Sequence, residues 1–334
     1  MSPQRCRVQS AECRGWPLLR VDYGGLILTC THICSTMQTR DNKRARLLPS
    51  ATLDTLDNDL LIRCASYLDA DGLAQLGRAS TIFGIPHAGQ ERSLVNEAAH
   101  QRFRQSATDE ERNRLPKYGD ESDIGLYRAL LLLREPLGFD EIVGDDLSAQ
   151  EHPAKVTCAG VDLFSTAMSG HVMRGGRHFV EFAINDMRNG LGDEIRISLG
   201  VIRPVSLTGW EGAVNPMFVS SFYRSDRSAG LQSQRTAKWG DSNIHCCTYF
   251  CLGGSCVWTD WNNERGCPEW QGREGLEESG TIGLLLDLGE GTLSVFKNGR
   301  RLGVMEEGLG GEYCWFVAVS SACMISMTKG RAAN

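Results

Sequence analysis

The sequence predicts a multidomain α+β protein in which a small helical unit is followed by an all-β antiparallel sandwich. Apolar residues recur at helical spacing in the first part of the chain and alternate with polar residues from about Phe139 onward. The pair Asn298-Gly299 is the strongest short hairpin signal, because a type I′ turn needs positive φ at both central positions. Short strands joined by glycine-rich turns indicate an antiparallel sandwich.

The same change of pattern predicts the domain limits. The 334 residues are enough for two cores. We expect a flexible tail at residues 1–48, a helical region with its connector at 49–138, and the sandwich at 139–330. The sandwich carries an insertion rich in cysteine and tryptophan around residues 240–275. The arginine-rich start of the tail leaves a targeting peptide, or a later start codon, as alternatives.

The composition favours a protein of the cytoplasm, the nucleus or both. The net charge of −6 argues against a general nucleic-acid binder, and no apolar stretch reaches the ~18 residues that span a bilayer. The 13 cysteines cannot all pair within one chain, so we expect mostly reduced thiols. Neither nucleic acid nor a membrane is expected as a partner.

Two short amphipathic helices are predicted directly after the tail. Asp57 or Asn58 is a good N-cap for the first helix, and residues 69–72 end it and cap the second. The apolar side chains of the first helix are predicted to share one face. They are Leu60, Leu61, Cys64 and Leu68.

Further helices are predicted between residues 92 and 135. Ser93 is an N-cap, and Thr108 with Glu111 has the spacing of a capping box. Residues 120–134 place apolar side chains on one helical face. These helices would extend the N-terminal unit into a small helical domain or a connector.

The first two helices resemble the F-box, a short helical motif that docks on the Skp adaptor of cullin–RING ubiquitin ligases. The resemblance implies that leucines of this region contact the adaptor. They are Leu56, Leu60, Leu61, Leu68, Leu73 and Leu76. The usual proline ahead of the first helix is displaced to Pro49, and Phe83 stands where a tryptophan is usual. A plain helical hairpin would show the same leucine spacing, so a core role is the alternative.

Residues 281–303 resemble the core hairpin of SPRY domains, since an apolar strand, a glycine turn and a second strand lead into Asn298-Gly299. Residues 175–182, 198–201 and 312–319 are similar to other SPRY strands, and the likeness covers about half of the chain. The resemblance implies a two-sheet sandwich that binds peptides or protein surfaces with the loops at its edges.

The long segment 203–280 is the predicted partner site. Loops at the ends of a sandwich are free for recognition, and this segment combines length, tryptophans and mixed charge. The predicted partner-binding residues are Arg203, Pro204, Trp239, Trp258 and Trp261. Trp258 and Trp261 are the pair expected to face solvent. The alternative is that the tryptophans pack the insertion against the sandwich.

The insertion also groups residues that can bind zinc. They are His245, Cys246, Cys247, Cys251, Cys256 and Cys267. Their spacing lacks the paired two-residue gaps that are typical of zinc sites, so no metal is predicted. Small buried thiols, or a disulfide formed on oxidation, are the alternatives.

The two resemblances together predict a non-catalytic substrate receptor of a cullin–RING ligase, which captures a target protein with its sandwich. No Walker loop, H-E-x-x-H motif or nucleophile elbow is present, so neither enzyme activity nor a cofactor is expected. A SPRY scaffold or binding protein without a ligase role is the alternative. A thiol or zinc enzyme in the insertion is a third hypothesis that no motif supports.

Overall fold

The computed structural model describes residues 56–160, 163–186, 196–219 and 225–330, which all belong to one compact unit, Leu53–Asn334. The predicted tail at residues 1–48 lies outside the described residues. The domain limits stay a prediction, because the described residues form a single unit. None of the helices in these ranges is long and apolar enough to cross a membrane.

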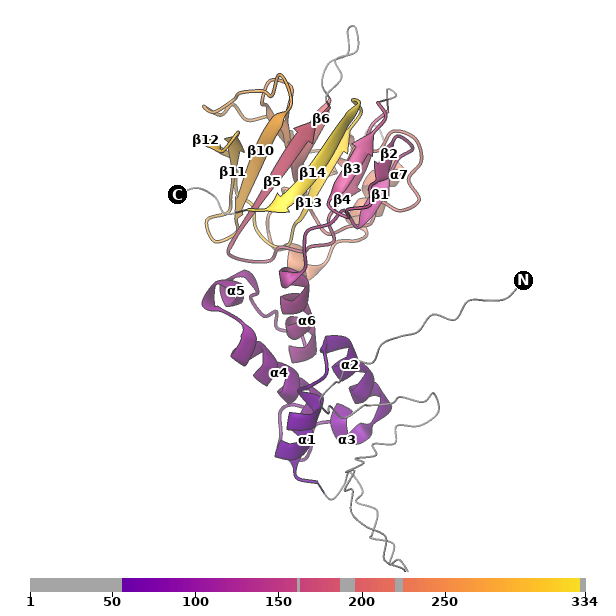
Figure 1. The fold of residues 1–334 in the computed structure, drawn as a ribbon, viewed down its shortest axis with the longest axis vertical. Coiled ribbons are helices and arrows are strands. Elements are labelled where there is room, and N and C mark those ends of the chain that lie inside the picture. Colours follow the sequence, from indigo (N-terminus) through magenta and orange to yellow (C-terminus); the bar gives the residue numbers. More distant parts are fainter. Residues whose placement is uncertain (1–55, 161–162, 187–195, 220–224, 331–334) are drawn as a thin grey trace, which may run out of the picture. The chain divides into compact units, whose positions relative to one another are not determined.

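Six short helices occupy the first part of the described chain (Figure 1). Their bounds are α1 Asn58–Ala65, α2 Ala70–Ala79, α3 Thr81–Gly84, α4 Leu94–Ser106, α5 Asp109–Arg114 and α6 Asp123–Arg134. Asp69 and Ser93 each accept a hydrogen bond from the backbone amide three residues on, which fixes the starts of α2 and α4. The predicted capping box between Thr108 and Glu111 is confirmed.

The helices enclose a core of their own, and α1 meets it with a different face from the one predicted. Leu61, Ile62 and Ala65 are buried, whereas Leu60 is 46% exposed and Cys64 is also exposed. Leu61 and Ala65 stand four residues apart and share the side of the helix that packs on α4. The predicted face is therefore wrong by one position, or about 100° around the helix.

From residue 141 the chain forms two antiparallel sheets that pack face to face, as predicted (Figure 1). The first sheet contains, in spatial order, β1 Glu141–Val143, β4 Ser165–Met168, β13 Cys314–Val319, β6 Ile197–Ile202, β7 Cys246–Phe250, β8 Cys256–Thr259 and β9 Arg265–Gly266. The second contains β12 Arg300–Glu307, β11 Thr292–Lys297, β10 Gly280–Asp287, β5 Arg177–Asn185, β14 Cys323–Lys329, β3 Lys155–Cys158 and β2 Leu147–Ala149. Side chains from both inner faces form the main core.

The hairpin that resembles a SPRY core is β10, β11 and β12. Asn298 and Gly299 connect β11 to β12 with φ angles of 50° and 77°, as a type I′ turn requires. Strand β10 pairs with β11 on one side and with β5 on the other. Ile282, Leu284 and Leu286 of β10 are fully buried, which confirms the apolar strand predicted for this hairpin.

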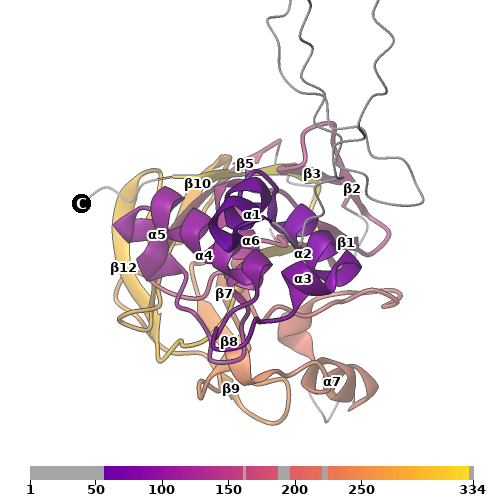
Figure 2. The ribbon, with the colours of Figure 1, turned by 90° about the horizontal axis from the view of Figure 1, so that it is seen from below.

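The segment between β6 and β7 covers the outer face of the first sheet. It carries η2 Pro216–Phe218, α7 Ser225–Gln232 and η3 Ala237–Trp239. Its apolar residues, among them Leu207, Val214 and Leu231, pack on outward-facing side chains of the first sheet and form a second core, which we call the outer core. Figure 2 shows the order of these layers, from β5 and β10 of the second sheet through β7 and β8 of the first to α7.

Contacts within the compact unit also join residues around α6 to the sandwich. Arg174, in the loop before β5, forms an ion pair with Glu121 at 2.7 Å, and both side chains are largely buried. The ammonium group of Lys329 on β14 donates a hydrogen bond to the carbonyl oxygen of Leu133 at 2.7 Å. Hydrogen bonds that involve a charged group are stronger than those between neutral groups. These contacts therefore hold the residues around α6 against the sandwich.

Candidate protein-interaction surface

Arg203, predicted at the rim of the partner site, is instead fully buried. Its guanidinium donates hydrogen bonds to the carbonyl oxygens of Gly310 at 2.7 Å and Glu312 at 3.1 Å. It also donates to the carbonyl oxygen of Ser242 at 2.9 Å and lies 4.1 Å from the ring centre of Tyr313. Burial lowers the pKa of Arg203 to about 10, so the group is charged at neutral pH. Arg203 therefore joins buried chain segments and cannot touch a partner.

Trp239 and Trp261 are fully buried in the outer core. Their ring centres are 5.9 Å apart, and the ring of His245 lies within 5.3 Å of both. The indole nitrogen of Trp261 donates a hydrogen bond to the carbonyl oxygen of Pro216 at 3.0 Å. The exposure expected for Trp261 is therefore wrong, because the segment between β6 and β7 closes over the sheet face on which both rings lie.

The other predicted partner residues, Pro204 and Trp258, are partly exposed. Pro204 follows β6, and Trp258 lies on β8 with its ring against the main core. Trp270 is also half-buried, and its indole nitrogen donates to the carbonyl oxygen of Gly254 at 3.0 Å. Within the described residues, the tryptophans of the insertion thus act mainly as packing groups, which was the alternative left open by the sequence.

The structure brings together a different group of aromatic residues, on the outer side of the first sheet. Phe218, the last residue of η2, is 44% exposed. Its ring centre lies 5.9 Å from that of Phe164 and 6.2 Å from that of Phe250. The guanidinium carbon of Arg265 lies 5.1 Å from the Phe218 ring centre. We call these four residues the phenylalanine surface.

The phenylalanine surface has the composition of an interaction site. Aromatic and arginine side chains are enriched at protein interfaces and carry much of their binding energy. Phe164 precedes β4, Phe250 ends β7 and Arg265 begins β9, so four separate segments contribute. Sequence reasoning missed these residues because no spacing in the chain reveals that they meet.

A second group of exposed side chains lies on α1. Leu60 is 46% exposed, Cys64 is exposed, and Tyr67, just past the helix end, is 88% exposed. Their spacing of four and three residues places them on one side, and we call them the α1 stripe. Of the other leucines that the F-box resemblance implies, Leu61 and Leu73 are buried in the helical core. The half-buried ones are Leu56, Leu68 and Leu76.

The zinc-ligand candidates of the insertion do not meet at one point. Cys246 lies in the outer core, whereas Cys251 lies in the main core and Cys267 is exposed. Cys247 and Cys256 also lie in the main core, with their sulfur atoms 3.8 Å apart.

The sandwich is similar to solved SPRY domains. The SPRY domain of human HERC1 shares 14% identity, with 59% of this chain and 99% of that chain covered and a TM-score of 0.39. The PSpry domain of TRIM65 shares 13% identity, with 59% and 90% covered and a TM-score of 0.37. A human SPRY domain shares 10% identity, with 57% and 97% covered and a TM-score of 0.34. No protein-family model and no curated protein matches the sequence.

Proposed function

We propose that this chain is a non-catalytic binding protein whose sandwich holds a partner protein at the phenylalanine surface. The observation that carries the proposal is the exposed ring of Phe218, supported by two further phenylalanines and Arg265. The partner that fits this chemistry offers an apolar side chain to the rings and a carboxylate to the arginine.

The rigid setting of the surface favours specific binding. Phe164 and Phe250 pack partly on the outer core, so they support the Phe218 ring from below. An aromatic side chain that is already held in place loses little conformational entropy when a partner covers it. A well-packed aromatic anchor of this kind is worth ~2 kcal/mol or more in an interface.

Phe218→Ala is expected to weaken partner binding at least tenfold while leaving the unfolding midpoint almost unchanged. The full chain and the variant are used as baits, and captured proteins are compared by quantitative mass spectrometry. The affinity of the purified partner is then measured for both. Tyr67→Ala, which removes an exposed ring from the α1 stripe, is the control that should keep the partner. A partner held equally by Phe218→Ala would exclude this surface.

We further propose that the α1 stripe binds the Skp adaptor, so that the chain acts as a substrate receptor of a cullin–RING ligase. The support is the exposure of apolar side chains on one side of α1, together with the F-box resemblance of this region. The chain would then supply proximity between a ligase and its target, with no chemistry of its own. A SPRY-like scaffold without a ligase role is the competing proposal.

Leu60→Asp combined with Tyr67→Asp is expected to abolish binding of the purified Skp adaptor to the full chain. Both side chains are exposed, so a charge there repels an apolar partner without entering the helical core. Binding is measured by isothermal titration calorimetry, with Phe218→Ala as the control that should still bind. If the unmodified chain shows no affinity at micromolar concentration, the ligase role fails and the scaffold proposal stands.

A further inference from the structure

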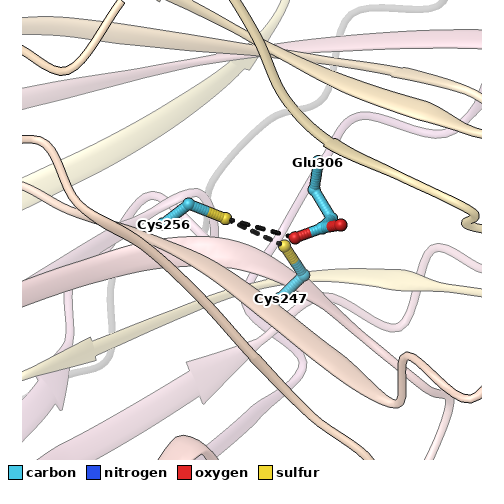
Figure 3. Close-up of side chains that lie close together, drawn as sticks. All are labelled: Cys247, Cys256 and Glu306. Atoms are coloured by element: carbon cyan, nitrogen blue, oxygen red, sulfur yellow. Dashed lines mark hydrogen bonds between the residues drawn. The ribbon is translucent and has the colours of Figure 1, made fainter. Parts of the chain in front are cut away.

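Two cysteines of the first sheet meet a glutamate of the second sheet inside the sandwich (Figure 3). Cys247 lies on β7, Cys256 begins β8 and Glu306 lies on β12. The two sulfur atoms are 3.8 Å apart, and the Cys256 sulfur is 3.7 Å from a carboxylate oxygen of Glu306. All three ligand atoms lie within 4.8 Å of one another. Both cysteines are fully buried, whereas Glu306 is partly exposed.

The carboxylate of Glu306 accepts hydrogen bonds from the Cys256 thiol and from the backbone amide of Glu307. Among the described residues, no lysine, arginine or histidine forms an ion pair with Glu306. The site therefore gathers three groups that can each donate electron pairs, with no cationic side chain among the described residues paired to them.

Two of the three separations match those that one tetrahedral ion would impose, and the third, between the Cys247 sulfur and the Glu306 carboxylate, is within 4.8 Å. Zinc binds sulfur at about 2.3 Å and carboxylate oxygen at about 2.1 Å, so tetrahedral angles place two sulfurs about 3.8 Å apart and a sulfur and an oxygen about 3.6 Å apart. The observed separations are 3.8 Å and 3.7 Å. Two of the three ligand–ligand separations are thus already those of a bound ion.

We propose that Cys247, Cys256 and Glu306 form a binding site for a thiophilic divalent cation, and that Zn²⁺ is the ion that fits best. Thiolate ligands select zinc over magnesium or calcium, which prefer oxygen. Three protein ligands leave the fourth position to water, which can reach the site beside the partly exposed Glu306. The thiols lose their protons when the ion binds. The ion links the edge strand β12 to β7 and β8 across the sandwich.

A disulfide is the competing use of the two cysteines. In the strand register Cys247 faces Trp258 and Cys256 faces Tyr249, so the cysteines are diagonal neighbours. A disulfide would need the sulfur atoms to approach to about 2.05 Å, well inside their present separation. It would also exclude Glu306 from any role. The two uses are distinguishable by experiment.

Cobalt(II) is the probe that tests the proposal, because thiolate ligation gives it a near-ultraviolet charge-transfer band and tetrahedral ligation gives it strong visible bands. The full chain is kept reduced, freed of metal with a chelator and titrated with Co²⁺ without oxygen. We expect these bands to saturate at one ion per chain and to vanish when Zn²⁺ is added.

Three variants assign the bands to this site. Cys256→Ser should remove them, and Glu306→Gln should weaken Co²⁺ binding at least tenfold. Cys251→Ser, which changes another buried cysteine of the main core, should leave them unchanged. Circular dichroism without metal checks that each variant folds. If Cys256→Ser fails to fold, Glu306→Gln alone tests whether the ion binds at this site. The side chain of Glu306 is partly exposed, so this variant is expected to fold.

Three results would overturn the proposal. The first is the absence of cobalt bands in the unmodified chain. The second is bands that persist at full strength in both Cys256→Ser and Glu306→Gln, which would place the ion on other thiols. The third is a Cys247–Cys256 disulfide in peptide maps of chain prepared under reducing conditions, which would assign the cysteines to a covalent link.

Discussion

Trp261→Ala is expected to lower the free energy of unfolding by about 3–5 kcal/mol, because it empties the centre of the outer core. The Trp261 ring is fully buried and touches the rings of Trp239 and His245. Its removal also leaves the carbonyl oxygen of Pro216 without its hydrogen bond.

Urea unfolding followed by circular dichroism measures this loss. Phe218→Ala is the matched control, because it removes an exposed aromatic ring near the same layer and should cost less than about 1 kcal/mol. Equal stabilities for Trp261→Ala and the unmodified chain would mean that the segment between β6 and β7 does not enclose this ring in solution.

The burial of Trp261 changes how binding experiments must be interpreted. Because Trp261→Ala loosens the outer core, it would also disturb η2, which carries Phe218. Lost partner binding in that variant would therefore report damage to the layer and would not place Trp261 in the interface. Phe218→Ala and Arg265→Ala test the interface directly, since both side chains are exposed.

Structures that depend on only a few neighbouring residues are predicted correctly from the sequence. The turn at Asn298-Gly299 and the capping box at Thr108 depend only on local backbone geometry, and both are present. The predicted buried face of α1 is wrong because Leu60 and Leu61 are adjacent and equally apolar. Only the position of α4 decides which of the two is buried.

The outer core could not be predicted from local sequence patterns, although one feature of the sequence indicates that the first sheet is covered on its outer face. Every residue of β6 and of β13 is buried, on both faces of the sheet. A continuous apolar run such as residues 314–319 is typical of a strand covered on two sides. Read in that way, it predicts that another segment covers the sheet, and it argues against exposed tryptophans in that segment.

The phenylalanine surface and the Cys247–Cys256–Glu306 site depend on the strand order. Glu306 meets the cysteines only because β12 lies opposite β7 and β8 in the other sheet. Phe164 meets Phe218 only because the segment between β6 and β7 returns across the first sheet. Neither encounter leaves a spacing that a single sequence could reveal.

Acidification from about pH 6.5 to pH 4 is expected to destabilise the fold, because buried histidines are held neutral in it. Burial lowers the pKa of His178 to about 3 and the pKa values of His171 and His245 to about 4. Arg114 and Lys329 contribute to the shifts of His171 and His178 by repelling a positive charge. A histidine in the unfolded chain has a pKa of about 6.5.

The sign follows from which state binds more protons. Above about pH 6.5 both states hold these histidines neutral, so the stabilising contribution is complete. Below about pH 6.5 these histidines are protonated in the unfolded chain but stay neutral in the folded chain. Each histidine then lowers the free energy of unfolding by up to about 1.4 kcal/mol per pH unit until its folded pKa is reached. The raised pKa values of Glu306 and Glu312 act in the opposite direction, whereas the lowered pKa values of Glu111 and Asp123 act in the same direction as the histidines, so the histidine contribution must be isolated by comparing variants.

Urea unfolding across this pH range, compared between variants, isolates the histidine contribution. His178 is buried, and its Nε2 donates a hydrogen bond to the carbonyl oxygen of Gly175 at 2.8 Å. His178→Gln can keep that bond through its side-chain amide but cannot take up a proton, so its stability should fall less steeply with acidification. His87→Gln, at an exposed position in the loop after α3, should reproduce the slope of the unmodified chain. Identical slopes for all three chains would mean that His178 takes up its proton equally in the folded and the unfolded state.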